Sequence, residues 1–156
     1  MERRLVDGDE LAAVIGTLAG QPVVNASWLL DSMVMLDLGV IRTAATADEA
    51  GEFVFTLETG TWRLVDQDER VVHSASGAGD IRAGLARCLH GGRVSRAHYD
   101  PLTAVLRLDL ESGSHLVVTP HGDAWSDAES WSLTTPDGRS YSHLPGGRIE
   151  LERSVD

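Results

Sequence analysis

The chain has a single cysteine, Cys88, and no lysine among its 156 residues. One cysteine excludes an internal disulfide framework and a cysteine-based zinc cluster. No apolar run approaches the roughly 20 residues that a membrane-spanning helix needs. The first residues also lack the apolar segment and cleavage site of a signal peptide. We therefore expect a cytoplasmic protein that is not inserted in a membrane.

Positive charge is also scarce. Thirteen arginines face 24 acidic residues, which gives a net charge of −11 at pH 7 with histidine neutral. Nucleic acid is therefore a poor candidate partner, because phosphate contacts need a positive field. An acidic surface speeds the encounter with an opposite charge, so a basic protein is the better candidate. We interpret the absence of lysine as codon bias.

The length and composition are those of one soluble globular domain. A chain of this length can bury close to 70% of its unfolded surface. Hydrophobic residues make up 42% and charged residues 24%, which disfavours disordered and fibrous classes. We expect residues 1–156 to form a single domain.

Two segments carry the apolar period of a helix. In residues 9–18, apolar side chains recur at i, i+3, i+4 and i+7, and Asp7 or Asp9 can cap the start. Residues 80–89 repeat this signal, with Cys88 on the apolar face. Glycines follow both segments, where a helix ends in a left-handed turn.

Short strand-like runs follow each helix. After the first helix come two runs around a turn near residues 30–32, then "EFVFTLE", "TWRLVD" and "RVVHSA". After the second helix come two runs around Asp100-Pro101, a third run after residues 111–113, and then "ESWSLTT", "SYSHL" and "RIELE". Short alternating runs separated by turn residues are typical of half-buried antiparallel strands.

The order of elements is the same in residues 9–77 and 80–152, and we interpret this as a divergent duplication. The copies align with offsets of 69 to 72 residues at Leu18/Leu89, Gly20/Gly91, Val23/Val94, Ala26/Ala97, Leu36-Asp37-Leu38/Leu108-Asp109-Leu110, Trp62/Trp131, Leu64/Leu133, Asp68/Asp137 and His73/His143. One copy is marginal as a separate core. The sequence thus predicts an α+β fold with two helix-plus-antiparallel-sheet units, related by pseudo-twofold symmetry around one core that contains both tryptophans.

The C-terminal stretch "DAESWSLTTPDGRSYSHLPGGRIELE" resembles an uncharacterised bacterial family of unknown function. Its members close with an acidic-Ala-Trp stretch, a Pro-Asp-Gly turn, a Pro-Gly-Gly turn and a final strand. The matching residues here are Glu129, Trp131, Leu133, Pro136, Asp137, Gly138, Pro145, Gly146 and Gly147. Some members look like immunity proteins or small accessory proteins. The resemblance implies no catalytic residue.

No compact catalytic or metal-binding motif is present. The candidate metal ligands lack close spacings such as H-E-x-x-H, and they are His98, His115, His121, His143, Asp100, Asp109 and Asp123. His115 and His143 lie in strand-like segments, where we expect them on the surface. We predict no metal, no cofactor and no catalytic residue, although a Ser/His/Asp triad could still assemble in space.

Two further candidates have simpler interpretations. Cys88 could act as a nucleophile with His90, but the C-terminal end of a helix raises a thiol pKa, so we expect a buried core cysteine. The glycine-rich "SASGAGDIRAGL" could hold a phosphate at a helix start. Asp80 there would repel an anion, and we interpret the segment as a linker between the repeats.

Asp37 and Asp109 occupy matching positions, each between two leucines of a strand. Alternation turns both carboxylates toward solvent. If the two halves brought them together, one of them would have a raised pKa and could serve as a general acid.

The most suggestive segment for binding is "HGDAWSDAES", because it combines acids with a loop tryptophan. The leading hypothesis is a non-enzymatic acidic binding protein, of the type of an immunity inhibitor that blocks a basic toxin or enzyme. Its predicted partner-binding residues are His121, Asp123, Trp125, Asp127 and Glu129. The tryptophan packing back on the sheet is the alternative for this segment.

The alternative function is a small enzyme or small-molecule-binding protein with a pocket at the seam between the repeats. Polar groups from both copies would converge there, namely Asp37, Asp109, His73 and His143. An enclosed apolar pocket favours this hypothesis, whereas a solid core with an exposed acidic and aromatic patch favours the first. The sequence leaves the oligomeric state open.

Overall fold

The computed structural model describes residues 2–29, 33–39, 52–58, 61–120 and 130–153. These residues form a mixed α+β fold of two antiparallel sheets and two helices, as predicted. The helices are α1 (Gly8–Gly16) and α2 (Ala78–Cys88). Within the described part of the chain, neither helix has the length and apolar character that a membrane span requires.

The larger sheet has seven strands in the order β1-β12-β11-β10-β4-β3-β2. Its strands are β1 (Glu2–Val6), β2 (Val23–Leu29), β3 (Met33–Leu38), β4 (Phe53–Leu57), β10 (Trp131–Thr134), β11 (Arg139–His143) and β12 (Ile149–Arg153). The smaller sheet has five strands in the order β6-β5-β9-β8-β7. Its strands are β5 (Thr61–Val65), β6 (Val71–His73), β7 (Val94–Tyr99), β8 (Leu106–Leu110) and β9 (His115–Thr119).

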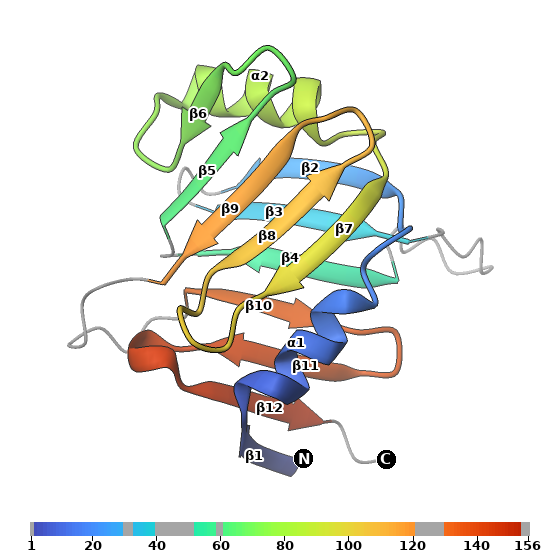
Figure 1. Ribbon diagram of the computed structural model, residues 1–156, viewed down its shortest axis with the longest axis vertical. Helices are drawn as coiled ribbons and strands as arrows, with labels where there is room; N and C mark the ends of the chain where they lie inside the picture. Colours follow the sequence, from blue (N-terminus) through green and yellow to red (C-terminus); the bar gives the residue numbers. More distant parts are fainter. Residues whose placement is uncertain (1, 30–32, 40–51, 59–60, 121–129, 154–156) are drawn as a thin grey trace.

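The two sheets form two layers that share one core (Figure 1). The five-stranded sheet lies in front of the half of the larger sheet that contains β2, β3 and β4. Helix α1 lies beside β7 and in front of β10, β11 and β12, while α2 lies at the opposite end near β6. Trp62 and Trp131 are both buried in the core, which confirms the prediction for these two side chains.

Helix α1 begins where the sequence signals place it, whereas α2 begins at Ala78, two residues before the predicted start, without a side-chain cap. Asp7 caps α1, because its Oδ1 accepts a hydrogen bond of 2.8 Å from the backbone N–H of Glu10. The apolar residues at helical spacing face the core, with Leu11 and Ile15 fully buried in α1 and Ile81 buried in α2. Packing of these apolar stripes against the sheets supplies most of the stability of such short helices.

The N-terminal strand β1 is an element that the sequence analysis missed. It pairs only with β12, at the edge of the larger sheet, with Arg4 opposite Leu151 and Val6 opposite Ile149. Its sequence "ERRLV" has no apolar alternation. Its strand conformation follows from pairing with a segment about 150 residues away, which no local pattern indicates.

Each sheet contains strands from both halves of the chain. β4 pairs with β10, with Phe55 opposite Leu133, and β5 pairs with β9, with Leu64 opposite Leu116. Both pairings are antiparallel, and each joins the third strand after one helix to the fourth strand after the other helix. The two halves therefore cannot separate without breaking both sheets.

Reciprocal hydrogen bonds connect the segments that follow the two helices. The N–H of Gly20 donates to the carbonyl of Val94 at 2.7 Å, and the N–H of Gly91 donates to the carbonyl of Val23 at 2.9 Å. Both glycines have positive φ, 85° and 79°, which glycine adopts at little cost. Each of β2 and β7 has a register shift directly after its first valine, between Val23 and Asn25 in one and between Val94 and Arg96 in the other.

Candidate functional site

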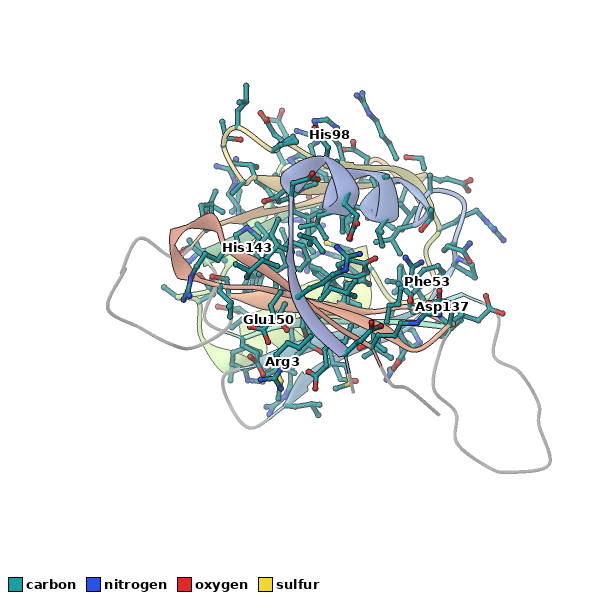
Figure 2. All side chains as sticks on the ribbon, turned by 90° about the horizontal axis from the view of Figure 1, so that it is seen from below. Arg3, Phe53, His98, Asp137, His143 and Glu150 are labelled. Carbon is teal, nitrogen blue, oxygen red and sulfur yellow. The ribbon has the colours of Figure 1, made fainter. Side chains whose placement is uncertain are left out.

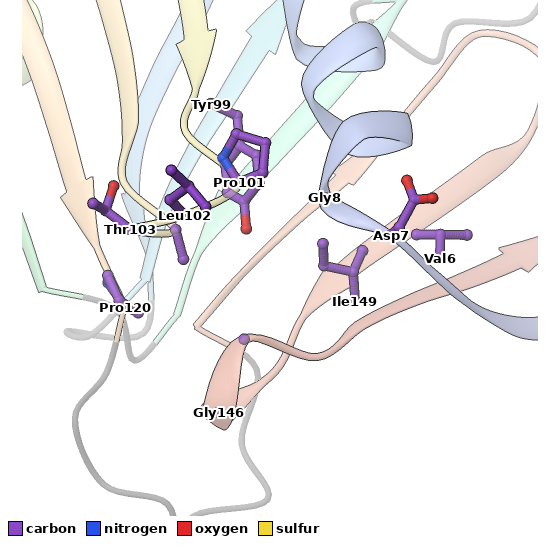
Figure 3. A pocket seen from close by; sticks show the side chains of 12 residues that line it. Val6, Asp7, Gly8, Tyr99, Pro101, Leu102, Thr103, Pro120, Gly146 and Ile149 are labelled. Atoms are coloured by element: carbon purple, nitrogen blue, oxygen red, sulfur yellow. The ribbon is translucent and has the colours of Figure 1, made fainter.

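An open pocket of about 600 Å³ lies where the β1–α1 junction approaches the β7–β8 turn and the turn before β12 (Figure 3). Residues that precede the first repeat and residues of the second repeat contribute to it. Its lining residues are Val6, Asp7, Gly8, Tyr99, Pro101, Leu102, Thr103, Ala104, Pro120, Gly146, Gly147 and Ile149. We call it the turn pocket.

A glycine allows α1 to approach the opposite wall of the turn pocket. A Cβ atom at Gly8 would lie 2.7 Å from Cβ of Pro101, closer than two carbon atoms can approach without displacement. Figure 3 shows Gly8 at the start of the helix facing Pro101 across the pocket. Asp7 also lines the pocket, but one of its carboxylate oxygens is engaged in capping α1.

The β7–β8 turn exposes an apolar side chain to solvent. Asp100 Oδ1 accepts a hydrogen bond of 2.9 Å from the backbone N–H of Leu102, and the carbonyl of Asp100 accepts another of 2.8 Å from Ala104. This Asx turn fixes Leu102, whose side chain is 95% exposed. The hydrogen bond from Leu102 lowers the pKa of Asp100, so this carboxylate is charged at neutral pH.

A buried histidine lies next to the floor of the turn pocket. His143 is 0% exposed and pairs in register with Ile149, which in turn pairs with Val6. Its Nε2 shares a hydrogen bond of 3.0 Å with the hydroxyl of Tyr99, and its ring stacks on Trp131 with centroids 5.1 Å apart. Figure 2 shows His143 between the layers and His98 on the outer surface.

Burial lowers the pKa of His143 to about 4, so the ring is neutral at pH 7. Its Nδ1 has no hydrogen-bond partner among the described residues. Tyr99 lines the turn pocket, whereas His143 does not. Because burial also raises the pKa of Tyr99, its hydroxyl stays protonated. The only carboxylate that lines the turn pocket, that of Asp7, already caps α1.

The surface position expected for His143 is wrong. Strand β11 alternates so that Tyr141 and His143 face the core while Ser140 and Ser142 face outward. The proposed alignment of His73 with His143 is also displaced by one residue. Arg63, which follows Trp62, lies opposite His73. Ser132, which follows Trp131, lies opposite Ser142 and not opposite His143.

The four polar residues proposed for a seam pocket do not line the turn pocket. Asp37 lies in β3 of the larger sheet and accepts a hydrogen bond of 3.3 Å from Asn25. Asp109 lies in β8 of the smaller sheet and pairs with Arg107 at 2.9 Å. Both alternate with core leucines, in different sheets. Asp109 is half-buried, but Asp37 is only 7% exposed, so the predicted solvent-facing position is wrong for Asp37. His73 is exposed on β6.

The partner-binding residues predicted from the sequence lie outside the described residues. These are His121, Asp123, Trp125, Asp127 and Glu129. The segment that contains them follows Pro120, which lines the turn pocket.

Cys88 is buried in the core, as predicted, and burial raises the pKa of its thiol. In the part of the chain that the structure describes, no three His, Cys, Asp or Glu side chains lie close enough to hold a metal ion. His121 and Asp123 lie outside the described residues.

No protein-family model, curated protein or solved structure matches this chain. The resemblance to an uncharacterised bacterial family therefore stays a hypothesis.

Proposed function

We propose that this chain is a non-enzymatic, cytoplasmic binding protein that receives an apolar side chain of a basic protein partner in the turn pocket. An inhibitor that blocks a basic toxin or enzyme, of the immunity type, is the form that we favour. The observation that carries the proposal is Leu102, a leucine 95% exposed at the edge of a pocket of about 600 Å³. Exposed apolar groups beside a pocket are typical of interaction sites.

The apolar character of the proposed contact follows from the residues around the turn pocket. Leu102 and Pro101 supply exposed apolar surface at the rim, and Val6 is half-buried, whereas Tyr99 and Ile149 are buried beneath the pocket. A bound aromatic or aliphatic side chain would remove this surface from water. Such central anchors contribute most of the binding free energy in many interfaces.

Acidic residues near the turn pocket favour a basic partner. Asp7 lines the turn pocket, Asp9 and Glu10 follow it in the first turn of α1, and Asp100 begins the β7–β8 turn. The segment after Pro120 adds three more acidic residues to the sequence. The net charge of −11 would speed association with a positively charged partner at low salt, and it disfavours nucleic acid.

Leu102→Ser is expected to weaken binding of such a partner by about 30-fold or more, which corresponds to about 2 kcal/mol. Partners are captured from lysate on the wild-type chain, purified, and measured by calorimetry at two salt concentrations. The matched control is Leu5→Ser, because Leu5 is also an exposed leucine, 65% accessible, but lies in β1 and does not line the turn pocket.

A basic protein that binds wild type and Leu5→Ser equally, loses affinity for Leu102→Ser, and binds more weakly at high salt supports the proposal. Equal affinity for both variants would exclude the turn pocket as the interface. A captured partner that is acidic, or binding that salt does not weaken, would contradict the proposal that the partner is a basic protein.

A second candidate function is the binding of a small molecule in the same pocket. The hydrogen bond between Tyr99 and His143 favours it, because this buried polar pair lies beside a pocket whose lining is both polar and apolar. Native mass spectrometry distinguishes the two functions. A small ligand that copurifies with the wild-type chain and is displaced in Tyr99→Phe supports the second.

We also propose that the chain arose by duplication of residues 9–77 and 80–152, with pseudo-twofold symmetry between the copies. The matching order of one helix and the five strands after it, the exchange of strands between the two sheets and the reciprocal hydrogen bonds at Gly20 and Gly91 support this origin, whereas β12 has no counterpart in the first copy. β1 lies outside both copies.

The duplication predicts equal energetic roles for Gly20 and Gly91. Alanine at either position must adopt a positive φ, which costs about 1–2 kcal/mol, and no atom lies within 4 Å of either added Cβ. Urea denaturation of Gly20→Ala and Gly91→Ala is therefore expected to give equal losses within about 0.5 kcal/mol. A difference above about 1 kcal/mol would argue against equivalent environments.

A further inference from the structure

A second pocket, of about 180 Å³, lies on the same face of β1, β12 and β11 as the turn pocket, at the other end of these strands. Its lining residues are Glu2, Arg3, Arg4, Arg139, Leu151 and Arg153. We call it the arginine pocket. Four arginines and one acidic residue line it, although the whole chain carries a net charge of −11.

Strand register brings three of these arginines together. Arg153 lies between Glu2 and Arg139 in one cross-strand row, and Leu151 lies between Arg4 and Tyr141 in the next. Leu151 and Tyr141 are buried core residues, so this is the inner face of the sheet. Arg4, Arg139 and Arg153 therefore project from three adjacent strands around a leucine floor.

The cross-strand pair of Arg139 and Arg153 places two like charges directly opposite each other, an arrangement that is unfavourable without a counter-charge. Asp137 partly compensates Arg139, with 2.8 Å between Nε of Arg139 and Oδ2 of Asp137. Arg153 forms no ion pair with any described residue, and Glu2, opposite it in register, is not within ion-pair distance.

Three of the four lining arginines are held by the protein, and Arg3 is one of them, because it pairs with Glu150 and Glu152. Arg139 Nη1 donates a hydrogen bond of 2.9 Å to the hydroxyl of Tyr141, and Arg4 Nη2 donates one of 3.1 Å to Glu10. Each of these contacts uses only part of a guanidinium with five N–H donors. The remaining donors, and all those of Arg153, are available for an oxyanion.

We propose that the arginine pocket binds a phosphate group. Guanidinium groups recognise phosphate through paired, charge-assisted hydrogen bonds, and three of them from a fixed sheet face supply several such donors. The volume is equivalent to about six water molecules, which suits a phosphate group. This site is separate from the turn pocket and does not depend on the proposed function.

The test is a titration with inorganic phosphate at pH 7, followed by amide NMR shifts, with sodium chloride adjusted to keep ionic strength constant. Saturable shifts are expected at Arg139, Leu151 and Arg153. Arg153→Gln is expected to weaken binding about fivefold or more, because the loss of one exposed charge has a moderate effect. Glu2→Gln is expected to strengthen binding about twofold, since it removes the one carboxylate that lines the pocket.

Arg96→Gln is the matched control, because Arg96 is an exposed arginine on β7 that does not line the arginine pocket. Shifts that do not saturate, or equal affinity in Arg153→Gln and Arg96→Gln, would overturn the proposal. A parallel titration with phenyl phosphate distinguishes the source of the group. Tighter binding than inorganic phosphate indicates a phosphate ester, and equal or weaker binding indicates the free ion.

Discussion

Trp131→Ala is expected to lower the free energy of unfolding by about 4 kcal/mol, a large part of the stability of a domain of this size. Trp131 is 1% exposed, and its ring contacts Phe55 and Tyr99 with centroids 5.4 and 6.1 Å away and stacks on His143. It also lies on β10, opposite Leu57 of β4, where strands from the two halves of the chain join. Urea denaturation followed by circular dichroism measures the loss.

Leu5→Ala is the matched control for this measurement, because Leu5 is exposed at the sheet edge and its truncation is expected to change stability by less than about 0.5 kcal/mol. Trp131→Phe should recover part of the loss by keeping an aromatic ring in the cluster. A loss below about 1 kcal/mol for Trp131→Ala would contradict the central position of this side chain.

Local patterns predicted the elements of this fold well. The helix over residues 9–18 follows from apolar side chains such as Leu11 and Ile15 at helical spacing and from a capping aspartate, and both signals act within one or two turns. The strands of both halves follow from short alternating runs between turn residues. These features depend on neighbours in the sequence, which is why the sequence alone reveals them.

The arrangement of those elements depends on distant pairings and was less predictable. No local signal indicates that β4 pairs with β10 rather than with a strand of its own half, or that the charged segment Glu2–Val6 completes the sheet beside β12. Sheet order is decided by which apolar faces can be covered together, and this is a property of the whole chain.

The candidate site was predictable only in part. The alternation Arg-Ser-Tyr-Ser-His on β11 placed His143 on the same face as Tyr141, and this signal would have indicated its burial. The turn pocket has no such signal, because its lining comes from separate segments, including Gly8, Pro101 and Gly147, that share no motif. A pocket built from turns becomes visible only when the elements are placed in space.

Acidification is expected to destabilise the protein through His143. In the unfolded chain this histidine titrates near 6.5, and in the folded chain burial lowers its pKa to about 4. Between these values the unfolded chain binds a proton that the folded chain does not, so the free energy of unfolding decreases as pH falls below 6.5. The loss levels off below pH 4, after about 3 kcal/mol. Urea denaturation at pH 7, 5.5 and 4.5 measures it.

Between pH 6.5 and 4, the effect of His143 on stability can be distinguished from the effects of the carboxylates. The folded-state pKa values of Asp66, Asp100 and Asp137 are lowered, so their contributions to stability are lost only at more acidic pH. His115 acts in the same direction as His143, because burial and the nearby Arg107 lower its pKa, and His115→Gln measures its share.

His143→Gln removes the titrating group and keeps a side chain that can hydrogen-bond to the hydroxyl of Tyr99. The variant should be less stable than the wild type at pH 7. Between pH 6.5 and 4 its free energy of unfolding should fall less than that of the wild type, because unfolding of the variant takes up to one fewer proton. An unchanged pH dependence, or an NMR titration of His143 near 6.5, would contradict the burial of this ring. Because the folded ring, stacked on Trp131, stays neutral until pH falls to about 4, the loss of stability above that pH comes from proton uptake by the unfolded chain.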